Sequence, residues 1–491
     1  MAKITTIIDI GSNSMRMVVL KKTSRFGFHL INESKCKVKI SEGCYQNGGN
    51  LQQVPMQRAF EALKSFLHIS NALKSRKILC VATSALRDAP NKAEFVSRVS
   101  KELGLNIKVI DGSKEAYYGG VAALNLLHTD NFVTVDIGGG STEFAIVKNK
   151  KIVDYISLDI GTVRLKELFF YKDDMQGAKE YILGELKKVS PEHMQDISTV
   201  VGIGGSIRAI SKLFMNDMEY PLDVLHGFDY KYKEHKSYFE DIINAKNESE
   251  LRKLGVKKDR YDTIKEGAFI FNTILSYFDI DSVVTSGVGV REGVYLCDLL
   301  RNQNDKFPEN FNLSVRTFID RFELDGKLTA YLGNNATKIF QALKPLHNLD
   351  TKYNSLLVVA SKLHSVGTTL NFYKYSENSF DFILNGLNYG FSHSDKVLIA
   401  HMIKFSTNDL PTSDDLYEYK ELLPDTWIVQ WLSFMLSLNV ALNSDYGRRK
   451  YEYALERNEL TISDGDIPYF IRENIDKLEV PIGLRLVVSS E

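Results

Sequence analysis

The sequence has little cysteine, no long hydrophobic run and almost no net charge. Its four cysteines form no C-x-x-C pair, which speaks against both a zinc site and a disulfide framework. The first residues lack the apolar segment of a signal peptide, and no apolar run reaches the roughly 18 residues that span a bilayer. We therefore expect a protein of the reducing cytoplasm without a membrane span.

The formal net charge of −1 gives no global attraction to nucleic acid or to a membrane surface. An anionic substrate would therefore need a local basic cleft. With 491 residues, of which 44% are hydrophobic, the chain is too long for one ordinary core. A length of this size predicts about three globular domains.

Short β-rich runs alternate with helical patterns over the first 300 residues, which is typical of an α/β architecture. The pattern restarts near residue 130, and beyond a polar linker at residues 302–310 helical periodicity dominates. These changes predict three domains, at residues 1–125, 126–304 and 305–491. The last is expected to be helical, although its final fifty residues could include a few strands.

Two segments of twelve residues resemble one another in polarity and in the placement of glycine. They are DIGSNSMRMVVL, residues 9–20, and DIGGGSTEFAIV, residues 136–147. Each reads as a strand, a tight glycine turn and a second strand. Asp9 aligns with Asp136, and Ser14 with Ser141. The match predicts a duplicated domain whose two copies face each other.

A glycine turn after a buried strand lets backbone N–H groups approach an anion closely. The first turn offers Gly11, Ser12, Asn13 and Ser14, and the second offers Gly138, Gly139, Gly140, Ser141 and Thr142. Asp9 and Asp136 end their strands, where carboxylates could hold a hydrated Mg²⁺. For a single hairpin of this kind, the simpler explanation is that glycine serves only the geometry of the turn. Two copies in register favour a phosphate site instead.

The two copies differ in one charged position, because Arg16 aligns with Glu143. Arginine suits a bidentate phosphate contact, whereas a glutamate suits a metal or a water. Both side chains could instead be outward charges on alternating strands. Their position beside the glycine turns favours function.

Four further segments carry candidate residues with an ordinary structural alternative. Ser84 and Arg87 follow a strand at a helix start, where N–H groups suit a phosphate. Glu115 lies in the first turns of a helix and could serve as a general base, although the residues alone favour an ordinary capping glutamate. Two more glycine turns precede helices. They supply Gly204, Gly205, Ser206 and Arg208 in one case, and Arg291 in the other.

Three histidines of the C-terminal region, His364, His393 and His401, could suggest a metal site. The residue after His364 is Ser365, where a metal-binding His-Asp pair would need aspartate. We therefore expect ordinary histidines at a helix surface.

Seven ordered motifs resemble those of the Ppx/GppA phosphatases, a family in the superfamily of actin, sugar kinases and heat-shock chaperones. In chain order they are DIGSNSMR, ATSALRDA, SKEAYYGG, DIGGGSTE, LDIGTVRL, GIGGSIRAI and SGVGVREG, within residues 4–300. The resemblance implies two ribonuclease-H-like, actin-like domains with a cleft between them. The C-terminal region would then match the third domain of the long members, which is HD-like and here has a degenerate metal motif.

The resemblance also implies an activity and the roles of individual residues. It implies release of the terminal phosphate from inorganic polyphosphate, or of the 5′-γ-phosphate of pppGpp to give ppGpp, with Mg²⁺ or Mn²⁺. Glu115 would activate water, and Asp136 and Glu143 would be the metal and water ligands. The implied phosphate contacts are Asn13, Arg16, Arg87, Ser141 and Thr142, with Arg291 implicated in guanosine tetraphosphate recognition.

Three functional classes remain open. The first is phosphoanhydride hydrolysis, with polyphosphate and pppGpp undecided. The second is a small-molecule kinase of the same fold, against which the SKEA and SGVGVREG motifs speak. The third is a non-catalytic alarmone-binding regulatory protein, whose expected sign would be a lost glutamate or broken glycine turns. The C-terminal domain could extend the cleft, lengthen a path for a chain substrate or mediate a homodimer. The basic run at residues 448–450 could serve that path or could equally be an ordinary solvated surface.

Overall fold

The computed structural model describes residues 3–489, which form two compact units that divide between Phe311 and Asn312. The division falls a few residues beyond the expected boundary at 304/305. Within the described residues, no helix combines the length and the apolarity needed to cross a membrane.

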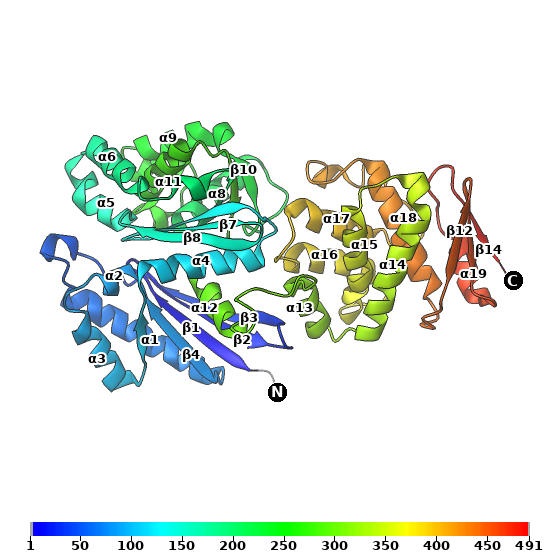
Figure 1. Cartoon of the computed structure of the whole chain (residues 1–491), viewed down its shortest axis with the longest axis horizontal. Helices are drawn as coiled ribbons and strands as arrows, with labels where there is room; N and C mark the ends of the chain where they lie inside the picture. Colours follow the sequence, from blue (N-terminus) through cyan, green and yellow to red (C-terminus); the bar gives the residue numbers. More distant parts are fainter. Residues whose placement is uncertain (1–2, 490–491) are drawn as a thin grey trace. The chain divides into compact units, whose positions relative to one another are not determined.

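The first unit contains two sheets, and its first sheet has the strand order β3-β2-β1-β4-β5 (Figure 1). Strand β2 pairs antiparallel with both β1 and β3. Strand β4 pairs parallel with β1, and β5 pairs parallel with β4. The central strand β1 is mostly buried, because β2 and β4 pair with its two edges and α12 packs against it. The strands are β1 (Ile4–Ile10), β2 (Met15–Lys22), β3 (Phe28–Cys36), β4 (Lys77–Ala82) and β5 (Ile107–Val109).

The second sheet repeats this order as β8-β7-β6-β9-β11, with β10 added antiparallel at the edge. The directions of its first five strands match those of the first sheet. This repeated ribonuclease-H-like topology confirms the predicted duplication. The strands are β6 (Phe132–Ile137), β7 (Thr142–Lys148), β8 (Lys151–Leu158), β9 (Thr199–Ile203), β10 (Asp229–Lys231) and β11 (Ser282–Thr285).

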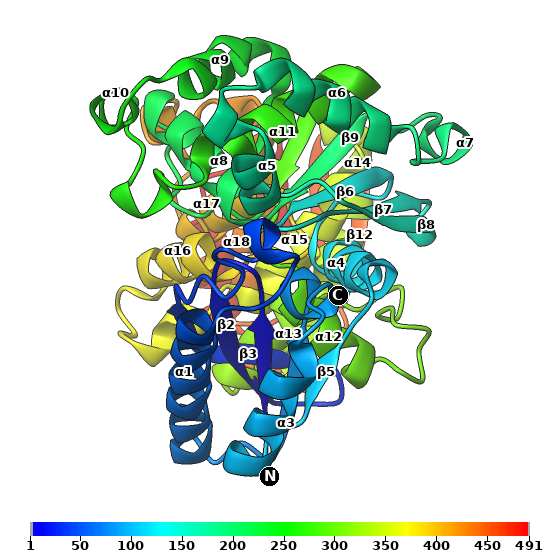
Figure 2. The same cartoon turned by 90° about the vertical axis from the view of Figure 1, so that its left-hand side faces the viewer.

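Amphipathic helices cover both sheets, as Figure 2 shows for α1 and α3 beside the first sheet and for α8, α9 and α11 beside the second. Helix α1 buries Met56, Phe60, Leu63 and Phe66, which recur every three or four residues along one face. The longer helices of the unit are α1 (Gln53–Ala72), α3 (Lys92–Leu103), α4 (Gly112–Leu126), α5 (Thr162–Leu168), α6 (Met175–Leu186), α8 (Gly205–Asp217), α9 (Lys236–Asn244), α11 (Ile264–Phe278) and α12 (Val290–Leu299).

Two helices connect the halves of the first unit. Helix α4 follows the first sheet in the chain, yet it packs on β7 and β8 of the second, and in Figure 1 it runs between the sheets. Helix α12 follows the second sheet and packs on β1 of the first, as well as on α4. At their crossing a Cβ on Gly293 would lie 1.9 Å from the carbonyl oxygen of Tyr118, so only glycine fits there.

The second unit is helical, as predicted, and ends in a small sheet of order β12-β13-β14. The apolar helix α18 is its centre, with most of its residues buried. The principal elements are α13 (Leu313–Arg321), α14 (Gly326–His347), α15 (Lys352–Leu363), α16 (Tyr375–Gly386), α17 (His393–Lys404), α18 (Thr426–Leu442), α19 (Tyr469–Asp476), β12 (Glu452–Glu456), β13 (Glu459–Ser463) and β14 (Arg485–Val488).

The expectation that the three histidines lie at a helix surface is wrong for two of them. His393 and His401 are each only 1% exposed. The His401 ring packs edge-on against Phe380 and Tyr419, and burial lowers its pKa to about 4, so the ring is neutral. The sequence does not indicate this burial, because His401 is a single polar ring on an otherwise apolar helix face.

Candidate active site

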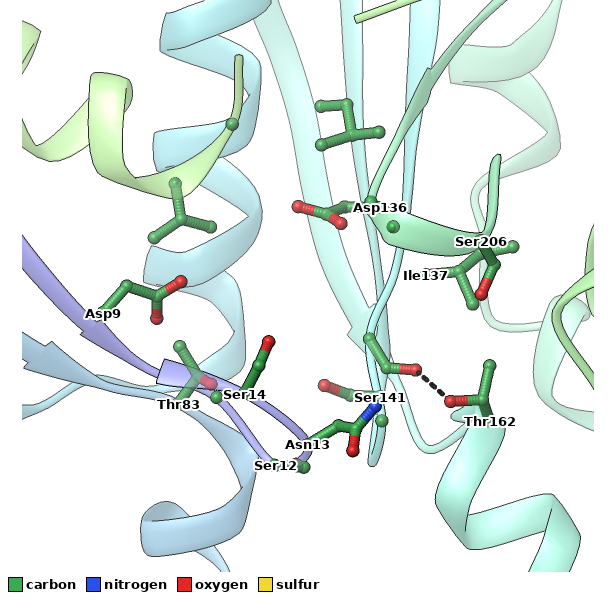
Figure 3. Close-up of a pocket in the computed structure, with 18 of the residues that line it drawn as sticks. Asp9, Ser12, Asn13, Ser14, Thr83, Asp136, Ile137, Ser141, Thr162 and Ser206 are labelled. Carbon is green, nitrogen blue, oxygen red and sulfur yellow. Dashed lines mark hydrogen bonds between the residues drawn. The ribbon is translucent and has the colours of Figure 1, made fainter. Parts of the chain in front are cut away.

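A pocket in the first unit lies where strands β1 and β6 end, with one sheet on each side. Figure 3 shows Asp9 and Asp136 on opposite sides of it, with their carboxyl groups pointing toward each other. Eighteen of the candidate residues from the sequence line it: Asp9, Gly11, Ser12, Asn13, Ser14, Arg16, Ser84, Glu115, Asp136, Gly138, Gly139, Ser141, Glu143, Gly204, Gly205, Ser206, Arg208 and Arg291.

The two hairpins have the register that their sequence alignment predicts. Asp9 pairs with Arg16 between β1 and β2, and Asp136 pairs with Glu143 between β6 and β7. Side chains of directly paired residues lie on the same face of a sheet. Each hairpin therefore presents one aspartate to the pocket, beside an arginine in the first half and a glutamate in the second.

The two glycine turns contact each other at the pocket. A Cβ on Gly139 would lie 2.8 Å from the Cβ of Ser12 in the opposite turn. The Ser12 and Ser84 hydroxyl groups are hydrogen-bonded at 3.0 Å. The second turn is closed by its own backbone, because the Gly138 N–H donates to the carbonyl oxygen of Ser141 at 2.9 Å. Glycine at position 139 therefore permits a spacing that a larger residue would disturb.

Backbone hydrogen bonds from the start of α5 hold the second glycine turn in place. The backbone N–H groups of Thr162 and Val163 donate to the carbonyl oxygens of Gly138 and Gly139, at 3.0 and 2.8 Å. The Thr162 hydroxyl also donates to Gly138, the dashed contact in Figure 3. These N–H groups are consequently engaged by the turn itself. The start of α8 differs, because its residues 204–206 line the pocket and can meet an anion.

Asp9 and Asp136 carry partly buried carboxyl groups, and Oδ1 of Asp9 is itself buried. Burial raises the pKa of Asp9 to about 6, against the opposing effect of Arg291 and Arg16, and Oδ1 of Asp9 has no hydrogen-bond partner among the described residues. Burial also raises the pKa of Asp136, which Arg208 opposes most strongly. Such groups gain from a cation placed between them.

Glu115 occupies the first turn of α4 and is 8% exposed. Burial raises its pKa well above the ordinary value, and the neighbouring Glu143 raises it further. Arg87 acts in the opposite direction, since its Nη1 donates to Oε2 of Glu115 at 3.1 Å. Glu143 accepts a hydrogen bond from Ser157 at 2.8 Å, and burial raises its pKa too. Glu115 is thus an oriented carboxyl group with increased basicity.

Four arginines line the pocket and offset its four acidic residues: Arg16, Arg208, Arg260 and Arg291. Arg291 is almost buried and donates to Oε1 of Glu33 at 2.8 Å. Arg208 donates from Nε to the carbonyl oxygen of Ser286 at 2.7 Å. Burial and the adjacent guanidinium groups of Arg16 and Arg291 lower its pKa to about 10. Guanidinium groups crowded in this way gain from a bound polyanion.

Three predicted phosphate contacts do not line the pocket. The Arg87 side chain is held by Glu115 and Asp88. The Thr142 hydroxyl is directed elsewhere, donating to the carbonyl oxygen of Ile160 at 2.6 Å. The carbonyl of Gly140 accepts from Nε of Arg164 at 2.8 Å. For Thr142 the alternation of β7 is the reason, because its side chain falls next to that of Glu143 in sequence and so on the other face.

Sequence reasoning left four polar lining residues without a role. Thr83 directly precedes the predicted Ser84, and Thr162 lies in the LDIGTVRL motif. Arg260 and Thr263 come from the loop before α11. That loop follows a short helix and not a strand, so only the folded arrangement identifies it.

Oxygen ligands of the kind that Mg²⁺ prefers are present at the pocket, notably Oδ1 of Asp9, which has no hydrogen-bond partner within residues 3–489. Among residues 3–489, no three His, Cys, Asp or Glu side chains stand close enough to form a complete metal site. Magnesium commonly uses one or two carboxylates together with waters and substrate phosphates. The residues therefore fit a substrate-assisted magnesium site better than a closed protein cage.

The model of the Ppx/GppA phosphatase family matches residues 18–302, more than half of the chain, and the model of its domain III matches residues 312–470. The chain belongs to the Ppx/GppA phosphatase family. The matched regions correspond to the two compact units, and the first of them contains the pocket.

Similar proteins include a curated relative and solved structures. A guanosine-5′-triphosphate,3′-diphosphate pyrophosphatase of Pseudoalteromonas translucida is 28% identical over 425 residues, covering 82% of this chain and 80% of its own. The crystal structure of the Aquifex aeolicus family member is 30% identical, with a TM-score of 0.53 over 62% of this chain and 99% of its own. An exopolyphosphatase from Cytophaga hutchinsonii, at 20% identity and TM-score 0.57, covers 62% and 100% and shows the shared fold.

Changing Gly139 to alanine tests whether the close contact of the two turns forms the pocket. The added methyl group would force the Ser12 turn away. A displacement of about 1 Å among groups that position a substrate can lower the reaction rate by up to about a hundredfold. We expect the affinity for tripolyphosphate, measured by calorimetry, to fall by about tenfold or more.

The matched control is Gly184→Ala in α6, where a Cβ would meet no atom within 4 Å. It should keep the wild-type affinity and stability, or gain slightly in stability because alanine favours helix. Equal affinity in both variants would show that the pocket does not depend on this contact.

Proposed function

We propose that this protein hydrolyses terminal phosphoanhydride bonds, with inorganic polyphosphate, pppGpp or both as substrates. Glu115 is the general base that deprotonates the attacking water. Phosphate oxygens are bound by the two glycine turns and by the arginines of the pocket. The family supports a phosphatase, and the similar pyrophosphatase of P. translucida supports a guanosine pentaphosphate substrate.

The position of Glu115 is the observation that carries this proposal. Its carboxyl group is buried at the pocket wall, on a helix that packs on the second sheet, and Arg87 fixes its orientation at 3.1 Å. A carboxylate whose pKa is raised accepts a proton from water more readily than an ordinary one. The opposing Arg87 charge favours the ionised form that a base requires.

The remaining residues suit a phosphoryl group at which negative charge accumulates. Arg16 belongs to the first half, and Arg208 belongs to the second. Hydroxyl groups of Ser12, Ser14 and Ser141 add neutral donors between them. Donors fixed on both sides of a phosphate can stabilise charge on its equatorial oxygens without reorganisation.

Magnesium fits the proposal as an ion held by one or two of the carboxylates of Asp9, Asp136 and Glu143, together with waters and the substrate phosphate. When bound, it would neutralise phosphate charge and so assist departure of the leaving oxygen. The carboxyl groups themselves orient the ion, because β1 and the β6–β7 hairpin hold them at fixed positions on the two sides of the pocket.

Replacing Glu115 with glutamine tests the general base. The amide keeps the size and a hydrogen-bonding oxygen but cannot take the proton, so phosphate release should fall by about 10²- to 10⁴-fold. The measurement is phosphate release from polyphosphate and from pppGpp with Mg²⁺, alongside a thermal unfolding curve that confirms the fold.

Glu102→Gln serves as the control, because Glu102 is an exposed glutamate of α3 that pairs with Arg98 and does not line the pocket. Its turnover should equal that of the wild type. Undiminished turnover in Glu115→Gln would refute the assigned role. A wild-type protein that binds alarmone but releases no phosphate would instead support the regulatory alternative.

The metal assignment predicts a changed magnesium requirement in Asp136→Asn. A neutral amide binds Mg²⁺ more weakly than a carboxylate. The Mg²⁺ concentration that gives half-maximal activity should therefore rise by about tenfold or more. The measurement is a Mg²⁺ titration of phosphate release after removal of metal with EDTA. Activity that persists without any divalent ion, or an unchanged titration, would exclude Asp136 as a ligand.

A further inference from the structure

The helical unit contains a cavity of about 420 Å³ that the proposed phosphatase chemistry does not use. It lies between the C-terminal part of α15, the loop after α17 and the C-terminal part of α18. Its size is within the usual range for small-molecule sites. Its polar and aromatic lining consists of His364, Ser365, Thr368, Phe372, Tyr375, Ser406, Thr407, Asn408, Ser437, Asn443, Ser444, Tyr446 and Asn474.

No Asp, Glu, Lys or Arg belongs to the lining, as far as the described residues show. A cavity without cationic side chains offers no compensation for the desolvation of a phosphate chain, and one without carboxylates offers little to a divalent cation. The ligand class that remains is neutral. A metal-binding His-Asp pair would have an aspartate at position 365, but the cavity has the neutral hydroxyl group of Ser365 there.

His364 supplies a hydrogen-bond acceptor to this neutral cavity. Its Nδ1 lies 3.0 Å from the carbonyl oxygen of Ser361, which fixes the proton on that nitrogen. Nε2 is left as the acceptor, with no partner among the described residues. Burial lowers the pKa of His364 below the ordinary value, and no charged group opposes this, so the ring stays neutral near pH 7.

The rest of the lining combines aromatic surface with amide groups. The Tyr375 ring stands edge-on to His364, with 6.4 Å between ring centroids. Phe372 and Tyr446 line the cavity and are 67% and 68% exposed, so a ligand can reach their rings. The Asn408 amide makes no hydrogen bond to another described residue, so both its donor and its acceptor are available.

We propose that this cavity binds a neutral nucleobase, free or as a nucleoside. A flat heterocycle can stack on exposed aromatic rings, as bases do on single-strand-binding proteins. Its edge carries adjacent donors and acceptors, which the Asn408 amide and Nε2 of His364 can satisfy together. A purely apolar ligand would leave these polar groups unpaired, which is unfavourable. The inference is independent of the phosphatase proposal, because it concerns the other compact unit.

The test is calorimetric titration of the full-length protein with guanosine, adenosine and uridine, none of which carries phosphate. We expect saturable binding of at least one of them. Asn408→Ala and Phe372→Ala should each weaken that binding by about tenfold or more, since each removes a direct contact. Both residues are exposed, so neither change should disturb the fold.

Two matched controls locate the site. Asn385→Ala removes an exposed amide of α16 that does not line the cavity, and Arg260→Ala alters the pocket of the first unit. Neither should change nucleoside affinity. The proposal is overturned by the absence of saturable binding with all three probes. Binding that survives both Asn408→Ala and Phe372→Ala, or that is lost in Arg260→Ala, overturns it as well.

Discussion

The crossing of α4 and α12 is the contact on which the candidate active site depends. The carbonyl of Tyr118 and the backbone of Gly293 approach so closely that a methyl group does not fit between them. Helix α4 carries Glu115 to the second sheet, and α12 carries Arg291 to the first. Each half of the unit therefore receives a functional side chain from a helix that follows the other half in the chain.

This exchange gives the pocket its balance of charge. Four carboxyl groups and four guanidinium groups line one small space, and each is wholly or largely withdrawn from water. Arg291 and Arg16 oppose the rise in the pKa of Asp9, while Arg87 does so for Glu115. Buried charges of this kind are stable only while the groups are held at fixed positions. A bound substrate phosphate with its cation would further offset the cost of burying them.

The sequence predicted the parts of this site that local chemistry determines. The repeated hairpin and its register follow from glycine and aspartate placement, and the paired strands confirm them. Arg260 could not be found in this way, because its loop reaches the pocket only through the packing of α11. Thr142 was expected at the phosphates, but strand alternation and its bond to Ile160 direct it elsewhere. The burial of His401 likewise depends on neighbouring helices.

The most direct test of the account is the fate of oxygen during one turnover of pppGpp in ¹⁸O-labelled water. A water activated by Glu115 and attacking the terminal phosphorus must place one ¹⁸O atom in the released phosphate and none in the ppGpp product. Mass spectrometry of both products distinguishes the outcomes. Label in the nucleotide product, or transfer of the phosphoryl group to an added acceptor in place of water, would contradict terminal phosphoanhydride hydrolysis in this pocket.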